Sequence, residues 1–212
     1  MKNKLLLILI FCGLGLYCVA QPAGFKEIPA EEKASVLKSI TAASKKITSL
    51  QLNFVQIKKV SMLTNAMKSQ GNMFYQTPMM LRWEYTVPKQ PAFVMNGNKA
   101  ALVDEKGTQT APNKAFQEVS KLIVNIMSGN ELTSGKNFKV YCYSNSKSYW
   151  LKMVPVNKRL KQMFSSINLM VNKSTKLASL VRIDEVSGDI TTIQFYNVVT
   201  NKPINNNLFY LK

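Results

Sequence analysis

The sequence contains no histidine. This absence excludes Ser-His-Asp and Cys-His catalytic pairs, together with every metal site built on imidazole ligands. Acidic residues are also scarce, because only eleven Asp and Glu accompany 28 Lys and Arg. The nearest carboxylate pairs, Asp104-Glu105 and Asp184-Glu185, stand close to Gly107 and Gly188 in segments typical of turns. Glycine-rich phosphate loops and CxxC motifs are lacking too. We therefore expect neither an enzyme nor a bound metal or cofactor.

The N-terminal residues 1–20 have the layout of a cleavable signal peptide. Lys2 and Lys4 precede an apolar run over residues 5–17, and Cys18-Val19-Ala20 supplies small residues at the cut. The run is shorter than the about 20 residues that a transmembrane helix needs. We expect cleavage to leave residues 21–212 as one β-rich domain in the periplasm.

Cysteine is rare, with three in the chain. A lipoprotein anchor at Cys12 or Cys18 is disfavoured, because Phe11 and Tyr17 precede these cysteines where a small residue is expected. Only Cys142 remains after cleavage, so no disulfide can form within the mature chain. We interpret Cys142 as a small buried hydrophobic residue.

The chain is strongly basic. Removing Lys2 and Lys4 lowers the formal net charge of +17 by two, to +15. The lysines are scattered and no aromatic RNA-binding motif accompanies them, so we expect no nucleic-acid partner. Attraction to anionic lipid headgroups or to an acidic partner suits an exported protein better, and a solvated surface that maintains solubility is an equally good explanation.

Two segments have helical periodicity. Between residues 31 and 47, Val36, Leu37, Ile40, Ala43 and Ile47 recur every three or four positions, which predicts an amphipathic helix. A second helix is predicted over residues 114–127. Its apolar stripe comprises Phe116, Val119, Leu122, Ile123 and Ile126, and Ser128-Gly129-Asn130 ends it.

The remainder alternates as short strands separated by turn residues. Asn96-Gly97-Asn98 predicts a hairpin, since Asn and Gly tolerate positive φ. In residues 81–85 the alternation is clearest, with Leu81, Trp83 and Tyr85 on one face. The predicted strands are 50–54, 71–75, 79–85, 92–95, 100–103, 138–143, 148–154, 165–171, 177–183 and 189–196, with Phe209 in a last strand. We predict an incomplete antiparallel β-barrel of about 11 strands, with a lid of α-helices over an apolar cavity.

Several methionines, including Met73, Met95 and Met153, fall inside predicted strands. A flexible thioether suits a surface that must accommodate varied acyl chains, although ordinary filling of core gaps is the commoner reason for methionine in strands. Composition leaves both explanations open.

The order of motifs resembles the family of periplasmic outer-membrane lipoprotein carrier proteins, the LolA-like proteins. After the first helix come Phe54-Val55-Gln56, then the segment 71–75, Pro78, the segment 81–85 and Pro88. The resemblance continues through residues 151–155 and 189–195 to Phe209 and spans nearly the whole mature chain. It implies a monomeric carrier that accepts lipoproteins from an inner-membrane ABC transporter, shields their acyl chains, and delivers them to an outer-membrane receptor. Transient contact with the membrane surface is compatible with this cycle.

Strand parity, counted from Leu81 and Trp83, assigns candidate positions in such a cavity. The acyl-chain-binding residues would be Leu52, Phe54, Met73, Tyr75, Leu81, Trp83, Phe93, Met95, Leu151, Met153, Leu169, Ile193 and Phe195. The lid contacts would be Ile40, Ile47, Leu122 and Ile126. Each of these residues has an alternative role in a plain core.

The chain departs from the family pattern at one position that bears on the lid. Familiar members carry an arginine immediately before the proline corresponding to Pro78, where it helps to hold the lid closed, whereas this chain has Thr77. Asn96-Gly97 is followed by Ala100 and Ala101 instead of large aromatic residues. Two alternatives to the lipoprotein carrier therefore stay open: a carrier of another outer-membrane lipid or glycolipid, and a periplasmic protein-binding adaptor or sensor on the same fold.

Overall fold

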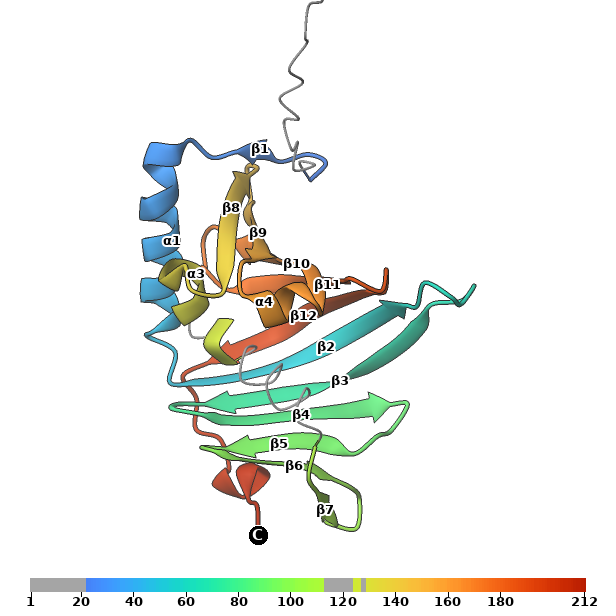
Figure 1. The fold of residues 1–212 in the computed structure, drawn as a ribbon. Helices are drawn as coiled ribbons and strands as arrows, with labels where there is room; N and C mark the ends of the chain where they lie inside the picture. The colour runs from blue at the N-terminus through green and yellow to red at the C-terminus, as the bar shows by residue number, and fades with distance from the viewer. Residues whose placement is uncertain (1–21, 113–123, 127–128) are drawn as a thin grey trace, which may run out of the picture.

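The structure is a computed structural model that describes residues 22–112, 124–126 and 129–212. A single twelve-stranded sheet dominates it (Figure 1), and every neighbouring pair of strands is antiparallel. The strands follow the order β1-β8-β9-β10-β11-β12-β2-β3-β4-β5-β6-β7, so the sheet has two free ends and is not a closed barrel. Their bounds are β1 Lys26–Glu27, β2 Ser49–Lys59, β3 Met67–Gln76, β4 Met80–Val87, β5 Ala92–Asn96, β6 Lys99–Val103, β7 Gln109–Thr110, β8 Phe138–Ser144, β9 Ser148–Pro155, β10 Phe164–Asn172, β11 Ala178–Glu185 and β12 Ile190–Thr200.

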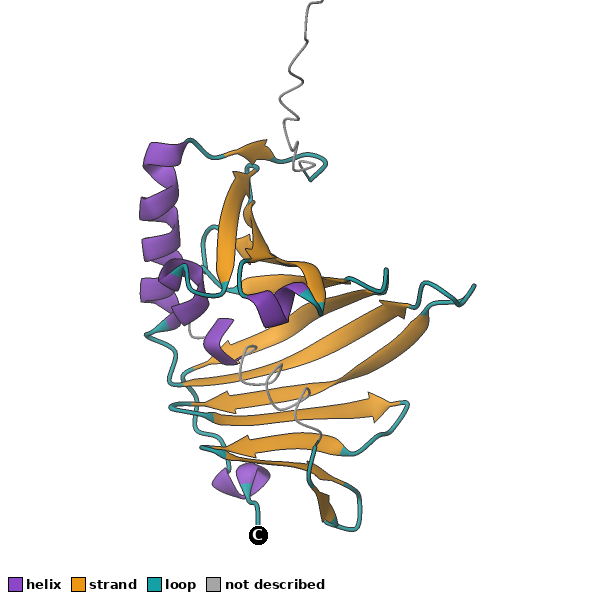
Figure 2. Ribbon diagram, viewed as in Figure 1, coloured by secondary structure: helices purple, strands orange, loops and turns teal. Residues whose placement is uncertain are grey.

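Few helices accompany the sheet (Figure 2). The longest, α1 (Ala30–Ser44), begins after Pro29 and has Glu31 and Glu32 in its first turn, where the helix dipole favours negative charge. Among the described residues the other helices are α3 (Asn130–Ser134), α4 (Lys158–Lys161) and the 3₁₀ helix η1 (Asn206–Phe209), and residues 124–126 are also helical. In the described part of the chain, no helix is long and apolar enough to cross a bilayer.

Two hydrophobic clusters fill the concave face of the sheet. The first cluster lies under α1 and α3 on strands β8 to β10, with Phe138, Leu151 and Met153 at its centre. The second cluster lies on β2 to β5, where the Phe54 and Trp83 rings are 4.3 Å apart between centroids. Val181 on β11 packs against both clusters. The clusters therefore meet along β11 and β12.

The C-terminal segment folds back over the opposite face of the sheet. Arg82 donates from Nη1 to the carbonyl of Leu208 at 3.4 Å, and Asn96 donates from Nδ2 to the carbonyl of Phe209 at 3.2 Å. Phe209 is fully buried, and so is Val94 on this face of β5. The segment therefore creates a second, smaller buried layer outside the concave core.

The predicted mostly-β architecture is confirmed: the antiparallel sheet is open, as expected for an incomplete barrel. The hairpin at Asn96-Gly97-Asn98 is present, with Gly97 at a φ of 58°. The prediction for Phe209 was wrong, because η1 and its contacts with β4 and β5 take the place of a last strand. The first helix ends at Ser44 instead of Ile47. Most of the second predicted helix lies outside the described residues, although residues 124–126 are helical.

Candidate functional site

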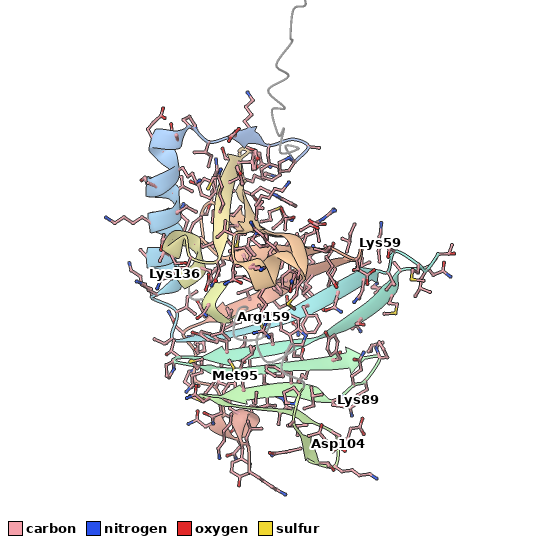
Figure 3. The ribbon with its side chains drawn as sticks, viewed as in Figure 1. Lys59, Lys89, Met95, Asp104, Lys136 and Arg159 are labelled. Carbon is pink, nitrogen blue, oxygen red and sulfur yellow. The ribbon has the colours of Figure 1, made fainter. Side chains whose placement is uncertain are left out.

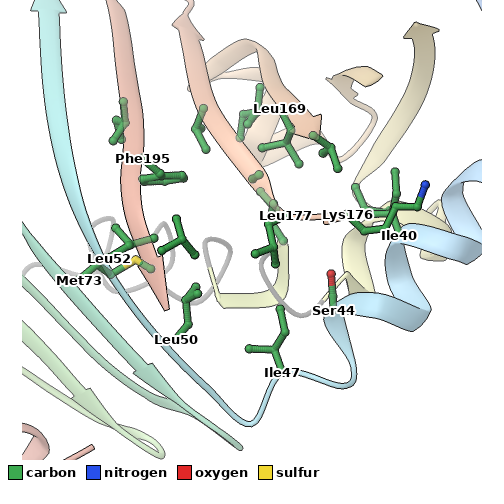
Figure 4. Close-up of a pocket in the computed structure, with 18 of the residues that line it drawn as sticks. Ile40, Ser44, Ile47, Leu50, Leu52, Met73, Leu169, Lys176, Leu177 and Phe195 are labelled. Atoms are coloured by element: carbon green, nitrogen blue, oxygen red, sulfur yellow. The ribbon is translucent and has the colours of Figure 1, made fainter. Parts of the chain in front are cut away.

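An apolar pocket lies between α1 and the concave face of the sheet (Figure 4). Its cavity volume is about 110 Å³. Residues from α1 and the segment that follows it, from α3, from β2, β3 and β4, and from β10, β11, β12 and the β10–β11 connection contribute to its walls. The lining comprises Ile40, Ser44, Ile47, Leu50, Leu52, Met73, Trp83, Ile126, Leu132, Phe164, Ile167, Leu169, Val171, Lys176, Leu177, Ala178, Val181, Ile183, Ile193, Phe195 and Val198.

Strand pairing explains the floor of the pocket. Leu169 on β10 stands opposite Val181 on β11, and Val181 stands opposite Ile193 on β12. Directly paired residues project from the same face of a sheet, so the three side chains form one apolar row. Leu151 on β9, opposite Leu169, extends the row into the first cluster.

Helix α1 supplies the facing wall. Ile40 and Ser44 lie one turn apart on it, and Ile47 follows in the connection to β2. The Thr41 hydroxyl donates to the carbonyl of Gly129 at 3.3 Å, next to α3. Gly129 has a φ of 75°, and a Cβ there would lie 2.9 Å from the Thr41 Cα atom, so only glycine allows this close approach.

Thr77, the residue in place of the family arginine, makes a local contact near the end of this wall. Its backbone N–H donates to the carbonyl of Thr48 at 2.9 Å, and its hydroxyl donates to the same oxygen at 3.3 Å. Asn201 secures the same connection, because its Oδ1 accepts from the Thr48 N–H at 2.8 Å and its Nδ2 donates to the Lys46 carbonyl at 3.2 Å. Thr77 and Asn201 thus fix the chain where it passes from α1 to β2.

The pocket offers almost no polar chemistry. Of the lining residues that the structure describes, only Ser44 and Lys176 have polar side chains. Within the described residues every buried side-chain nitrogen or oxygen has a hydrogen-bond partner, and no group of three or more His, Cys, Asp or Glu could hold a metal ion. The cavity therefore suits a hydrocarbon chain, whose burial needs shape and apolar surface and no directional polar contacts.

The predicted cavity residues divide between this pocket and the two clusters. The pocket is lined by Leu52, Met73, Trp83, Leu169, Ile193 and Phe195. The clusters contain Phe54, Tyr75, Leu81, Phe93, Met95, Leu151 and Met153, which are buried but absent from the lining. Of the predicted lid contacts, Ile40, Ile47 and Ile126 line the pocket, and Leu122 lies outside the described residues.

Sequence reasoning missed one side of the pocket. Val171, Leu177, Val181 and Ile183 come from β10, β11 and their connection, and Lys176 adds an ammonium group. The alternation of β11 marks Val181 and Ile183 as sharing a face, so pairing β11 with β12 would have identified them. Lys176 gave no such signal, because a lysine in a turn is ordinarily solvated.

Charge is dispersed over the molecule. Lys59, Lys89 and Lys136 project from separate parts of the surface (Figure 3). Lys58 forms ion pairs with Glu185 at 3.6 Å and Asp189 at 3.7 Å, and Lys89 forms one with Glu105 at 2.8 Å. In the described part of the chain, the lysines are therefore scattered over the surface, and the floor of the pocket is uncharged.

Comparison with known proteins gives consistent matches. The family model of the outer membrane lipoprotein carrier protein LolA matches residues 45–212. A protein named outer-membrane lipoprotein carrier protein from Nitrosomonas europaea is 24% identical over 183 residues, which cover 86% of this chain and 87% of that protein. One of the same name from Pseudoalteromonas translucida is 24% identical over 212 residues, covering 99% and 92% of the two chains. The crystal structure of a DUF1329 family protein from Desulfovibrio piger shares the fold at a TM-score of 0.50, with 8% identity and coverage of 86% and 97%.

Proposed function

Because this chain belongs to the LolA family of outer membrane lipoprotein carrier proteins, we propose that it binds the acyl chains of lipoproteins released from the inner membrane and delivers them to the outer membrane. The observation that supports this proposal most directly is the apolar pocket between α1 and the sheet. Its floor is the row formed by Leu169, Val181 and Ile193, and its facing wall is α1.

The physical need for such a pocket follows from the cargo. Each methylene of an acyl chain gains about 0.8 kcal/mol on leaving water, so a lipoprotein with two or three chains stays in its membrane unless a carrier covers them. Release requires that the acceptor bind the acyl chains more tightly than the carrier does. Helix α1 is separate from the strand ladder, so its displacement, with loss of the Thr41–Gly129 hydrogen bond, would open the pocket while the sheet stays paired.

We place this carrier in the periplasm, with residues 1–20 removed as a signal peptide and residues 21–212 forming the working domain. An inner-membrane ABC transporter and an outer-membrane receptor are the partners that the family role requires. The protein acts as a binding protein and not as an enzyme, which agrees with the apolar lining of the pocket.

Lipid retention by a pair of variants tests the proposal. Val181→Glu places a carboxylate on the pocket floor, whereas Leu180→Glu places the same group on the adjacent position of β11, whose partner Met170 faces away from the pocket. Each variant and the wild type are purified from a Gram-negative envelope and examined by native mass spectrometry. We expect acylated lipoproteins on the wild type and on Leu180→Glu, and none on folded Val181→Glu. Equal lipoprotein content in both variants would refute the pocket as the binding site.

A second candidate, a carrier of another outer-membrane lipid or glycolipid, is favoured by Thr77. This residue contacts only Thr48 among the described hydrogen bonds and offers no charge with which to hold a lid as the family arginine does. The same native spectra separate the two candidates, because a glycolipid or phospholipid bound in place of a lipoprotein identifies the second. A lipid-free protein in a stable complex with another protein would instead identify an adaptor.

A further inference from the structure

The turn between β10 and β11 brings two lysines to the edge of the apolar pocket. Asn172 organises this turn: its Oδ1 accepts from the Ser174 N–H at 2.8 Å, and its carbonyl accepts from the Lys176 N–H at 2.9 Å. The Lys173 N–H donates to the carbonyl of Lys147 at 3.0 Å. Lys176 itself has a φ of 59°. The backbone at both lysines is therefore held by hydrogen bonds.

The two ammonium groups lie near the same aromatic ring. Lys173 Nζ and Lys176 Nζ each lie 5.0 Å from the centroid of the Tyr149 ring. All three side chains are half-buried, and the described residues place no carboxylate within ion-pair distance of either lysine. A cation–π contact offsets part of the repulsion between like charges, but it does not neutralise them. The pair thus remains a local concentration of positive charge.

Lys176 joins this charge to the pocket. Among the described lining residues it is the one charged side chain, and it is followed directly by the lining residues Leu177 and Ala178. In Figure 4 its stem lies beside the apolar side chains while its nitrogen points away from them. A lysine in this posture covers apolar surface with its methylenes and presents the ammonium group at the boundary with water. Ser44 on α1 adds a hydroxyl to the same lining.

We propose that Lys173 and Lys176 form a headgroup site that binds the anionic group, a phosphate or a carboxylate, of an acyl lipid whose chain occupies the apolar pocket. This inference rests on the proposed acyl-chain pocket and favours the second candidate, a carrier of another lipid, because it names the class of ligand: an anionic amphiphile. The arrangement supplies each part of such a ligand with its counterpart, hydrocarbon against the row of Leu169, Val181 and Ile193, and charge against the paired ammonium groups. A half-buried ammonium pair binds an anion more strongly than exposed lysines do, because water screens it less.

A matched pair of probes tests the site. Monopalmitoylglycerol and palmitoyl lysophosphatidic acid share one acyl chain and differ by a single phosphate. Their affinities for the mature chain are measured by displacement of a fluorescent fatty-acid probe at low ionic strength. We expect the phosphate form to bind about tenfold more tightly. We expect this ratio to fall to about one in the double variant Lys173→Gln/Lys176→Gln, and to persist when both residues are replaced by Arg.

The control is the double variant Lys99→Gln/Lys106→Gln, which removes the same charge from exposed positions on β6 and the turn after it. It should keep the tenfold ratio. Equal affinity of the wild type for the two probes, or an unchanged ratio in Lys173→Gln/Lys176→Gln, overturns the headgroup site while leaving the acyl pocket intact. Binding of neither probe instead refutes the acyl-chain function. Inorganic phosphate at the same concentration should displace no probe, since displacement by phosphate alone would show a simple anion site without a lipid.

Discussion

Gly71 illustrates how one residue sets the spacing of the second cluster. It lies on the concave face of β3, paired with Phe54 on β2 and Tyr85 on β4. A Cβ at this position would collide with the carbonyl oxygen of Glu84 and lie 2.8 Å from the Phe54 Cζ atom. A side chain at this position would require both the β4 backbone and the packed Phe54 ring to shift, so steric exclusion requires glycine here.

We therefore predict that Gly71→Ala lowers the free energy of unfolding by about 1–3 kcal/mol through overpacking. The measurement is urea unfolding followed by tryptophan fluorescence. Ser69→Ala, two residues earlier on β3 and outside the aromatic cluster, serves as the control and should change stability little. A Gly71→Ala midpoint equal to that of the control would show that β3 and β4 can separate without loss.

Cys142 is a residue whose chemistry is suppressed by its position. It is 2% exposed within the first cluster, and burial raises the pKa of its thiol to about 11, although the Lys33 ammonium acts in the opposite direction. We predict that iodoacetamide at pH 8 leaves the native protein unmodified and alkylates it fully in urea, as read by intact mass. Rapid alkylation of the native protein would contradict the burial.

The same raised pKa has a consequence for stability. The thiol is protonated in both states below pH about 9, so its contribution is fully present there, and it is lost as pH rises from about 9 towards 11 because only the unfolded state ionises readily. Cys142→Ala should flatten this part of the pH profile. An identical decline in wild type and Cys142→Ala would assign the alkaline loss to other groups.

The C-terminal segment is the element that turns the outer face of β4 and β5 into buried surface. Phe209 is fully buried while Tyr210, its neighbour, is 65% exposed. We predict that Phe209→Ala lowers the free energy of unfolding by about 3–5 kcal/mol, whereas Tyr210→Ala leaves it nearly unchanged. Thermal unfolding of both variants makes the comparison. Equal melting temperatures would mean that the segment only rests on the sheet.

Elements with clear alternation were predictable, and elements without it were not. In β4 the pattern of Leu81, Trp83 and Tyr85 indicates the face that meets apolar matter, and Leu81 and Trp83 are buried as expected. The last segment, residues 201–212, has no strand period, and its fold depends on hydrogen bonds from Arg82 and Asn96 that no local pattern reveals. Local propensity therefore identified strands and missed η1.

At the scale of the whole molecule, parity predicted which side chains face inward but not where packing stops. Phe54, Leu151 and Met153 are on the expected face, yet they are sealed inside the clusters. The pocket opens where the two clusters meet, beside Val181 and Leu177, because the curvature of the sheet and the position of α1 decide how closely the walls approach. Sheet curvature and helix position depend on tertiary packing, so the alternation of residues in the sequence does not predict them.

That location makes a prediction about ligand binding and stability. A ligand in the pocket would touch both clusters through Val181, so it should stabilise the domain as a unit. Monopalmitoylglycerol at 100 times its dissociation constant should add about 2.7 kcal/mol, which raises the melting temperature by roughly 5–10 °C for a chain of this size. Differential scanning calorimetry measures the shift. Leu180→Glu should retain it and Val181→Glu should lose it, and a shift that survives Val181→Glu would place the bound chain outside the seam between the clusters.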